Sequence, residues 1–347
     1  MIEARGYAAK TATAPLAPFT FSRRDVGRND VLIEILYCGV CHSDIHQARD
    51  EWGGAIFPMV PGHEVVGRVV KVGKGVRKVR VGDPVGVGCF VDSCRKCSHC
   101  KDYQENYCDH HFSLTYNGTE MDQKTPTYGG YSDRIVVDER FVLKVPKNLD
   151  LARVAPLLCA GITTYSPLKH WKIGKGHKLG VMGLGGLGHM AVKFGKALGA
   201  HVSVISTSPS KQADAKKLGA KNFILSSDAA ALEKNAGSLD FILSTVAAKH
   251  DIELPLNLLK TDGTLILVGV PEVPLDMHPA SLIMKRKRIA GSLVGGTKET
   301  QEMLNFCGKK KILADIELIS MKQINEAFDR TVKGDIKYRF VIDNATI

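Results

Sequence analysis

The stretch Leu179-Gly-Val-Met-Gly-Leu-Gly-Gly-Leu-Gly188 decides the fold of the central part of the chain. A short apolar run leads into Gly183-x-Gly185-x-x-Gly188, and a helical pattern follows over residues 189–198. Between a strand and a helix, such glycines let the backbone approach a pyrophosphate at the helix N-terminus. This setting favours a dinucleotide-binding turn over a plain tight turn. The residues expected to form the turn are Gly183, Gly185, Gly186, Leu187 and Gly188.

Helical patterns alternate with apolar β runs on both sides of this turn. The β runs cover residues 178–182, 202–205, 241–243 and 265–268. Such alternation predicts a parallel, doubly wound sheet, so we expect an α/β Rossmann domain over residues 151–288. Residues 1–150 instead contain short β-rich runs divided by Gly and Pro turns. Residues 289–347 carry a helical segment, 299–308, and a closing strand, 338–342, which we expect to return to the first domain.

The end of the second β run of the expected sheet indicates which cofactor is preferred. A domain that binds NAD places an acidic residue there to bind the ribose hydroxyls. This chain has Ser206, Thr207, Ser208 and Lys211 and no carboxylate between them. Hydroxyls and a cation would hold a 2′-phosphate, which an acid would repel. The sequence therefore favours NADP(H).

Composition and charge exclude several classes of protein. The 347 residues, with 44% hydrophobic and 24% charged side chains, are typical of a soluble globular protein of two domains. We expect no membrane span and no signal peptide, which makes the cytoplasm the expected compartment. The net charge is +11, with basic runs at 285–288 and 309–311. No nucleic-acid module accompanies these runs, so we interpret them as solvated faces and expect a small-molecule partner.

The cysteines fall into two candidate metal sites. Cys94, Cys97, Cys100 and Cys108 lie within fifteen residues and would form a closed tetrahedral zinc site, with an iron–sulfur cluster as the competing interpretation. Cys41, His63 and Cys159 offer three ligands that suit zinc and leave a fourth position open, which is typical of a catalytic site. Because zinc is expected at Cys41, His63 and Cys159, we also expect zinc rather than an iron–sulfur cluster at the four-cysteine site. Cys38, Cys89 and Cys307 fit no pattern and are expected to be packing residues.

With these motifs in hand, the chain resembles the zinc-dependent medium-chain alcohol dehydrogenases, and most closely their cinnamyl alcohol dehydrogenase-like branch. The matches cover nearly the whole chain in family order. They are residues 38–46, 61–67, 81–88, 127–132, 158–166, 183–188 and 338–343, together with the four-cysteine lobe at about 90–110. The resemblance implies a GroES-like β-rich catalytic domain, residues 1–150 and 289–347, beside the Rossmann domain.

The resemblance also implies roles for single residues. Cys41, His63 and Cys159 look like ligands of a catalytic zinc, Glu64 like a nearby carboxylate that can approach the metal, and Asp44 like the acid that orients the histidine. Ser43 and His46 resemble the proton relay. His42, Thr163 and, more weakly, Arg339 resemble residues that contact the cofactor. The expected substrate-pocket residues are Trp52, Leu114, Tyr116 and Leu293.

The implied activity is reversible hydride transfer between NADP(H) and primary alcohols or aldehydes, aromatic or aliphatic, with two zinc ions per chain. One alternative is a binding or structural protein that keeps the fold and the metals without turnover. Another is a zinc-free quinone or enoyl reductase on the same scaffold, which the Cys41, His63, Cys159 set disfavours. The resemblance, and an apolar run at 265–270 that we expect to be an edge strand, predict a homodimer.

Overall fold

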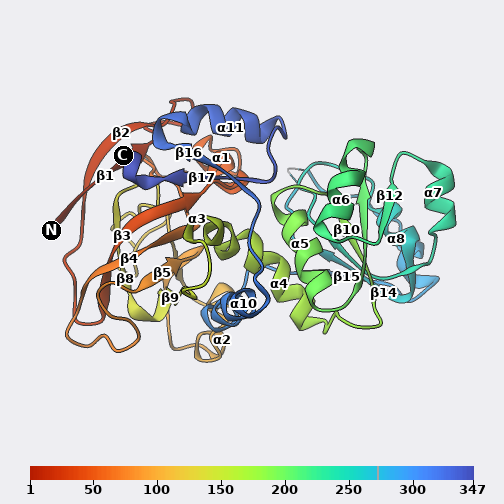
Figure 1. The fold of residues 1–347 in the computed structure, drawn as a ribbon, viewed down its shortest axis with the longest axis horizontal. Coiled ribbons are helices and arrows are strands. Elements are labelled where there is room, and N and C mark those ends of the chain that lie inside the picture. Colours follow the sequence, from red (N-terminus) through yellow and green to blue (C-terminus); the bar gives the residue numbers. More distant parts are fainter. Residues whose placement is uncertain (272) are drawn as a thin grey trace. The chain divides into compact units, whose positions relative to one another are not determined.

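The computed structural model describes residues 1–271 and 273–347, which pack as two units. Unit 1 comprises Met1–Ile162 and Gly295–Ile347, and unit 2 comprises Thr163–Val294. Figure 1 labels the helices and strands of both units. Within the described part of the chain, no helix combines the length and apolar character needed to cross a membrane.

Unit 1 is built around a mainly antiparallel sheet with the strand order β16-β17-β3-β4-β5-β9, to which β8 adds by pairing with β3. Two smaller sheets, β1-β2 and β6-β7, accompany it. The strands are β1 Ile2–Ala8, β2 Ala17–Arg23, β3 Asp30–Gly39, β4 Val65–Val72, β5 Pro84–Val87, β6 Phe90–Ser93, β7 Phe112–Leu114, β8 Arg134–Asp138, β9 Leu143–Lys144, β16 Ile316–Ser320 and β17 Arg339–Asp343. As expected, the closing strand returns to the first part of the chain: β17 pairs antiparallel with β3.

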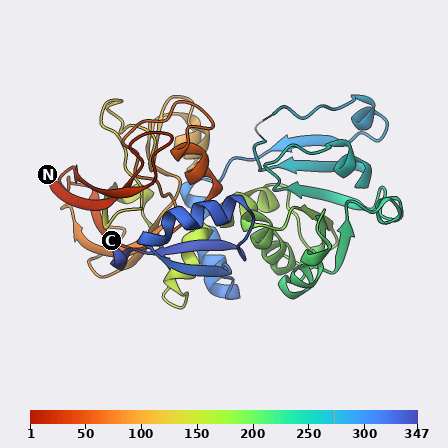
Figure 2. The ribbon, with the colours of Figure 1, turned by 90° about the horizontal axis from the view of Figure 1, so that it is seen from above.

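The helices of unit 1 are short except for α10 and α11. They are α1 His42–Ala48, α2 Ser98–Lys101, α3 Leu151–Val154, α10 Thr297–Lys310 and α11 Ile324–Val332, with 3-10 turns η1 Glu105–Tyr107, η2 Glu139–Phe141, η3 Ala155–Leu158, η5 Met321–Gln323 and η6 Asn344–Thr346. Figure 2 shows α11 beside β16 and β17. Arg330 of α11 binds Glu317 of β16 and lies over the ring of Phe340 of β17. Helix α4, Ala160–His170, spans the boundary between the units.

Unit 2 is a parallel sheet with the order β12-β11-β10-β13-β14-β15. In chain order this is 3-2-1-4-5-6, the arrangement of dinucleotide-binding folds, so the predicted doubly wound sheet is confirmed. The strands are β10 Lys178–Met182, β11 His201–Ser206, β12 Asn222–Leu225, β13 Leu239–Ser244, β14 Leu259–Leu267 and β15 Arg288–Gly291. The connections carry η4 Pro209–Lys211, α5 Gly186–Ala197, α6 Gln212–Leu218, α7 Ala229–Lys234, α8 Glu253–Leu258 and α9 Ala280–Ile283.

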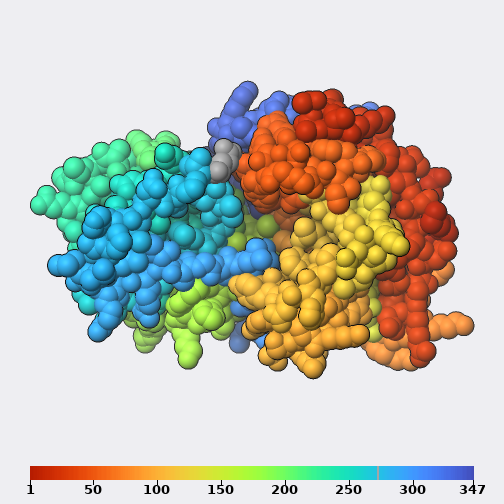
Figure 3. Space-filling view, turned by 180° about the vertical axis from the view of Figure 1, so that it is seen from behind, coloured from red at the N-terminus to blue at the C-terminus, as the bar shows by residue number. Residues whose placement is uncertain are grey.

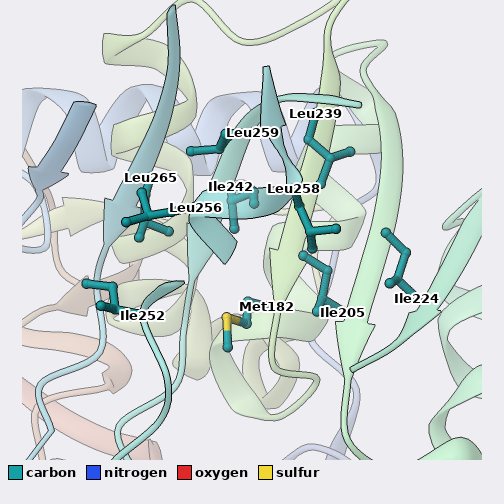
Figure 4. Close-up of a cluster of buried hydrophobic side chains, with 10 residues drawn as sticks. All are labelled: Met182, Ile205, Ile224, Leu239, Ile242, Ile252, Leu256, Leu258, Leu259 and Leu265. Atoms are coloured by element: carbon teal, nitrogen blue, oxygen red, sulfur yellow. The ribbon is translucent and has the colours of Figure 1, made fainter. Parts of the chain in front are cut away.

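A cluster of aliphatic side chains forms a core of unit 2 (Figure 4). Its members come from strands β10 to β14 and from α8 with its N-cap, and all are at most 8% exposed: Met182, Ile205, Ile224, Leu239, Ile242, Ile252, Leu256, Leu258, Leu259 and Leu265. Strands buried in this way carry runs of apolar residues without polar alternation, which is why the β runs stand out in the sequence. The core holds together the strand ends from which the glycine turn and the Ser206 loop emerge.

The expectation that residues 265–270 form an edge strand is wrong. Strand β14 contains Leu265 and pairs in parallel with β13 on one side and with β15 on the other. The strand at this edge of the sheet is therefore β15, Arg288–Gly291, and β12 lies at the opposite edge. The apolar run of β14 reflects burial inside the sheet, where Leu265 and Ile266 are fully covered.

Candidate functional site

The pairing of β3 with β4 brings the first two candidate zinc ligands together. Cys38 of β3 lies opposite Val65 of β4, and the backbone N–H of Gly39 donates to the carbonyl of Glu64 at 3.0 Å. Cys41 lies two residues after the end of β3 and is the N-cap of α1, while His63 and Glu64 directly precede β4. The two segments therefore end at the same place in the sheet. All three side chains are buried.

Cys159 completes a compact group of potential ligands. It follows η3, a turn of buried residues that packs on β3, β5 and β17. The ligand atoms of Cys41, His63, Glu64 and Cys159 all lie within 4.8 Å of one another. Two thiols, an imidazole and a carboxylate are donors that zinc accepts, so this set fits a zinc ion. The structure thus brings the predicted ligands together with the predicted nearby carboxylate.

The neighbours of Cys41 favour the thiolate form of its side chain. A hydrogen bond from the thiol of Cys159 lowers the pKa of Cys41 well below its usual range, and Arg339 and His63 add to this effect. A thiolate at Cys41 is the form that binds metal. The ring nitrogen Nδ1 of His63 lies 3.0 Å from Oδ1 of Asp44. Because a carboxylate only accepts, Nδ1 carries the hydrogen, and this leaves the lone pair of His63 on Nε2.

Glu64 forms a buried ion pair that the sequence did not reveal. Nη2 of Arg339 lies 2.6 Å from Oε1 of Glu64, and both side chains are at most 6% exposed. Burial raises the pKa of Glu64 to about 7, against the effect of Arg339. The other oxygen, Oε2, is buried, has no hydrogen bond within the described residues and lies over Gly39, where a Cβ would approach it to 1.9 Å. Oε2 is thus an unpaired acceptor at the ligand cluster.

The other predicted residues of this region lie around α1. Sγ of Cys41 lies 3.6 Å from Oγ of half-buried Ser43, and His42 is exposed. His46 is hydrogen-bonded to Glu51, and its ring stacks on that of Trp52 at 4.8 Å. Sequence reasoning had missed Glu51, although its distance of five residues along the chain from His46 places it just beyond the end of α1.

The predicted pocket residues differ in exposure. Tyr116 is 3% exposed and stacks on His63, with ring centroids 5.7 Å apart. Leu114 ends β7 and is half-buried, whereas Trp52 is 45% exposed. Leu293 belongs to unit 2 and is 51% exposed. Within unit 1, Tyr116 is the member of the set that directly contacts a candidate ligand.

The lobe at about residues 90–110 lies at the surface of unit 1 in Figure 3, and its four cysteines, three half-buried and one buried, form a second cluster. The Sγ atoms of Cys94 and Cys100 are 3.8 Å apart, and those of Cys97 and Cys108 are 4.0 Å apart. Two sulfurs bound to one tetrahedral zinc at ~2.3 Å would lie roughly 3.8 Å apart, so the spacing fits zinc. Hydrogen bonds from the backbone N–H groups of Cys97 and Lys96 lower the pKa of Cys94 to about 6.

The glycine turn in unit 2 has the shape expected for a pyrophosphate cradle. Gly183 has φ of +90°, and a Cβ at Gly188 would lie 2.0 Å from the carbonyl of Gly183, so both positions require glycine. A Cβ at Gly185 would meet nothing within 4 Å, which leaves the N-terminus of α5 open. Gly186 and Leu187 form the first turn of α5. This arrangement fits an anionic ligand at the helix N-terminus.

The loop after β11 carries the residues predicted to select the cofactor. Ser206 ends β11, and its hydroxyl accepts a hydrogen bond from the backbone N–H of Ser208 at 3.2 Å. Thr207 lies between them, and Lys211 ends η4. Thr163 is 6% exposed, and its buried hydroxyl has no hydrogen bond within residues 1–271 and 273–347. The Ser206 loop follows the carboxyl end of β11, and dinucleotides bind at the carboxyl ends of the strands in such sheets.

Comparison with known proteins agrees with both units. Residues 27–147 match the family described as "Alcohol dehydrogenase GroES-like domain", and residues 186–309 match "Zinc-binding dehydrogenase". The chain is 55% identical to aldehyde reductase YahK of Escherichia coli (strain K12) over 98% of this chain and 97% of the relative.

Solved structures of similar chains have the same fold. A cinnamyl alcohol dehydrogenase from Sorghum bicolor superposes with a TM-score of 0.97 at 49% identity, over 99% of this chain and 98% of that one. The crystal structure of CAD from Helicobacter pylori complexed with NADP(H) gives 0.93 at 46% identity, over 99% of both chains.

Proposed function

The chain belongs to the zinc-binding alcohol dehydrogenase family with a GroES-like domain, in the branch that includes the cinnamyl alcohol dehydrogenases, and from this premise we propose its reaction. It transfers hydride reversibly between NADP(H) and primary alcohols or aldehydes. The observation that carries the proposal is the convergence of Cys41, His63, Glu64 and Cys159 beside Ser43. Unit 1 is the proposed catalytic domain and unit 2 the proposed cofactor domain.

Cys41, His63 and Cys159 are the proposed ligands of the catalytic zinc, and the lobe cysteines hold the second ion. Zinc in the first site would supply a Lewis acid that makes the substrate hydroxyl more acidic. Asp44 fixes the ring of His63. Glu64, with its unpaired Oε2, is the proposed alternate ligand when substrate or water exchanges.

Ser43 and His46 are the proposed groups that move the hydroxyl proton toward solvent. Ser43 lies beside Cys41, and His46 lies one turn further along α1. Glu51 accepts a hydrogen bond from Nδ1 of His46 and so orients the ring with Nε2 available for proton transfer. In this pathway Glu51 is a positioning residue.

NADP(H) is the proposed cofactor, and it would supply the hydride acceptor or donor. The glycine turn would hold the pyrophosphate, and Ser206, Thr207, Ser208 and Lys211 would bind the 2′-phosphate. The CAD from Helicobacter pylori was crystallised with NADP(H), and a relative from Mycolicibacterium smegmatis is named an NADP-dependent alcohol dehydrogenase. These names, together with a loop that lacks a carboxylate, support the preference. His42, Thr163 and Arg339 remain proposed cofactor contacts.

The proposed substrates are aldehydes and primary alcohols with an apolar body. Relatives named aldehyde reductase and cinnamyl alcohol dehydrogenase support this class. Trp52, Leu114, Tyr116 and Leu293 remain proposed pocket residues. Tyr116, packed on the face of His63, has the strongest support among them.

We also propose a homodimer that forms through the edge of unit 2. Strand β15 has an unpaired edge, and exposed apolar side chains lie near it in sequence, including Ile283 at 74% and Met284 at 80%. The proposed compartment is the cytoplasm, because the described cysteines are free thiols and the thiolate sites need reducing conditions.

The test combines metal analysis with NADPH consumption on benzaldehyde and cinnamaldehyde. We expect two zinc ions per chain and turnover with at least one aldehyde. Cys159→Ser should keep the lobe zinc alone and lose turnover, and Ser43→Ala should keep both ions and lose most of the rate. Two ions without turnover would indicate a binding protein. Turnover that survives Cys159→Ser would indicate a zinc-free reductase mechanism.

A further inference from the structure

Asp44 is fully buried and is held by donors from separate parts of unit 1. Its Oδ1 lies 3.0 Å from Nδ1 of His63 and accepts from the backbone N–H of Gly62 at 3.2 Å. Its Oδ2 accepts from the backbone N–H of Cys41 at 2.8 Å and from the hydroxyl of Tyr131 at 3.2 Å. A buried polar group without hydrogen-bond partners costs free energy, so these donors stabilise Asp44 in its place. Among these four hydrogen bonds, the one from Tyr131 comes from neither ligand segment.

Tyr131 is placed by the segment that precedes β8. Its side chain is fully buried, and its ring lies so close to Gly62 that a Cβ there would approach it to 2.7 Å. The backbone N–H of Tyr131 donates to the carbonyl of Pro61 at 2.9 Å, and that of Gly130 donates to the carbonyl of Gly62 at 2.8 Å. The segment with Tyr131 is therefore laid directly along the segment that carries His63.

Two side chains from distant parts of unit 1 hold this segment. Arg23 of β2 donates to the carbonyls of Tyr128 and Gly129 and to the hydroxyl of Ser132, at 2.9 to 3.0 Å. The side-chain amide of Asn344 donates to the carbonyls of Gly130 and Ser132, both at 2.8 Å. These bonds occupy the backbone around Tyr131 on both sides. The hydroxyl therefore reaches Asp44 from a fixed position.

We propose that Tyr131 is a positioning residue for the zinc of the proposed catalytic site. Its hydroxyl fixes Oδ2 of Asp44, so that Oδ1 remains aimed at Nδ1 of His63 and Nε2 of that ring faces the metal. The inference rests on the proposed ligand role of Cys41, His63 and Cys159. Asp44 orients His63 through a direct hydrogen bond, whereas Tyr131 affects His63 only through its hydrogen bond to Asp44.

Removal of the hydroxyl alone should weaken zinc binding at this site and at no other. Loss of a partner behind a metal ligand costs 10–100-fold in metal affinity, and Asp44 keeps its backbone donors, so we expect a change of about 10-fold for Tyr131→Phe. The ring that packs on Gly62 is retained in this variant. The four-cysteine site provides a control within the same molecule, because the hydroxyl of Tyr131 is hydrogen-bonded to Asp44 and not to a cysteine of that site.

The experiment uses the zinc-loaded protein and a competing chelator with a colorimetric zinc signal. Cys159→Ser is expected to retain the lobe ion alone, so the zinc that it releases to the chelator defines the signal of the lobe site. The remaining signal of the unmodified protein then belongs to the catalytic site. Tyr131→Phe is compared with Tyr128→Phe, the same chemical change three residues earlier, on a ring that packs against Phe21 at 4.6 Å. We expect Tyr131→Phe to lower the affinity of the catalytic site about 10-fold and to leave the lobe site unchanged. Tyr128→Phe should change neither.

A second measurement separates positioning from general stability. In the Asp44→Asn background, Tyr131→Phe should have no further effect on zinc affinity, because the path through Asp44 is already broken. Equal loss from both sites, unchanged affinity, or failure of Tyr131→Phe to fold with excess zinc would each overturn the inference. Failure of the proposed function would look different: the unmodified protein would bind only one zinc ion, or it would bind two without turnover, whereas the Tyr131 inference concerns only the affinity of the catalytic site.

Discussion

The side chains of Arg339 and Glu64 form an ion pair and are both buried, so each charge is stabilised mainly by the other. Arg339→Leu would leave the carboxylate buried without its cation. Removing one partner of a buried pair costs about 3–5 kcal/mol, and we expect a loss of that size in the free energy of unfolding. Urea unfolding of the zinc-loaded protein measures it. The control is Arg49→Leu, which breaks an exposed pair with Asp329 and should cost about 1 kcal/mol or less.

At the same scale, Lys211 and Ser206 are expected to set the cofactor preference. A charge-assisted contact contributes about 1.5–3 kcal/mol, so Lys211→Ala should weaken NADPH binding roughly ten- to a hundredfold and leave NADH almost unchanged. Ser206→Asp should move the preference toward NADH, because it repels the 2′-phosphate and offers an acceptor to the ribose hydroxyl. The measurement is kcat/KM for both cofactors. Equal losses with both cofactors in Lys211→Ala would contradict the role of this loop.

The candidate ligands were predictable from sequence because their chemistry is carried by residue type and by neighbours along the chain. Among the partners behind these ligands, Asp44 was implied by the resemblance and does contact His63, whereas Tyr131 and the pairing of Arg339 with Glu64 were not predicted. Tyr131 reaches Asp44 only because residues 129–131 lie along residues 60–62, and no local pattern reports that pairing. Gly39 resembles any glycine after a strand, yet a Cβ there would collide with Glu64. Contacts of this kind depend on how segments far apart in the sequence pair with each other, and only the structure shows that pairing.

At the scale of elements, the four-cysteine lobe supports the start of α10. The N-cap of α10 is Gly296, which offers no side chain. The buried carboxylate of Glu105 instead accepts from the backbone N–H of Thr297 at 3.0 Å and from its hydroxyl at 2.9 Å. A Cβ at Gly296 would lie 1.7 Å from the carbonyl of Tyr103. The lobe thus supplies both the cap and the packing surface of a helix almost two hundred residues later in the chain.

We therefore expect Glu105→Ala to destabilise unit 1 by about 2–3 kcal/mol, since it leaves a buried N–H and a hydroxyl without an acceptor. Glu105→Gln keeps an acceptor and should lose about half as much. Urea unfolding measures both, and amide exchange at Thr297 locates the effect. An unchanged rate of amide hydrogen exchange at Thr297 in Glu105→Ala would show that the hydrogen bonds from Glu105 do not stabilise the start of α10.

Sequence patterns gave the elements well and their neighbours less well. The helix expected at 299–308 is α10, Thr297–Lys310, because Met303, Leu304 and Cys307 repeat on one face. Strand order is a different matter. An apolar run looks the same at the edge of a sheet and inside it, so the sequence cannot tell the two positions apart for β14, and only the register shows that β15 lies beyond it.

At the scale of the whole molecule, the edge of β15 leads to a prediction about assembly. We expect light scattering to give twice the chain mass of 37.7 kDa. Met284→Glu should return the mass to that of one chain, because it places a charge in the proposed apolar contact. Leu318→Glu, on exposed β16 of unit 1, is the matched control and should leave the mass unchanged. A mass near 37.7 kDa for the unmodified protein would rule out the dimer.

The pairing of β17 with β3 also has a consequence for biosynthesis. Residues 339–343 settle beside a strand that leaves the ribosome about 300 residues earlier. Unit 2 is one continuous segment between them and can complete its sheet first. Until β17 arrives, β3 lacks a neighbour on that side and Glu64 lacks Arg339. The thiols of Cys41 and Cys159 are therefore synthesised long before the domain around them can close, and a nascent chain must keep them reduced throughout that interval.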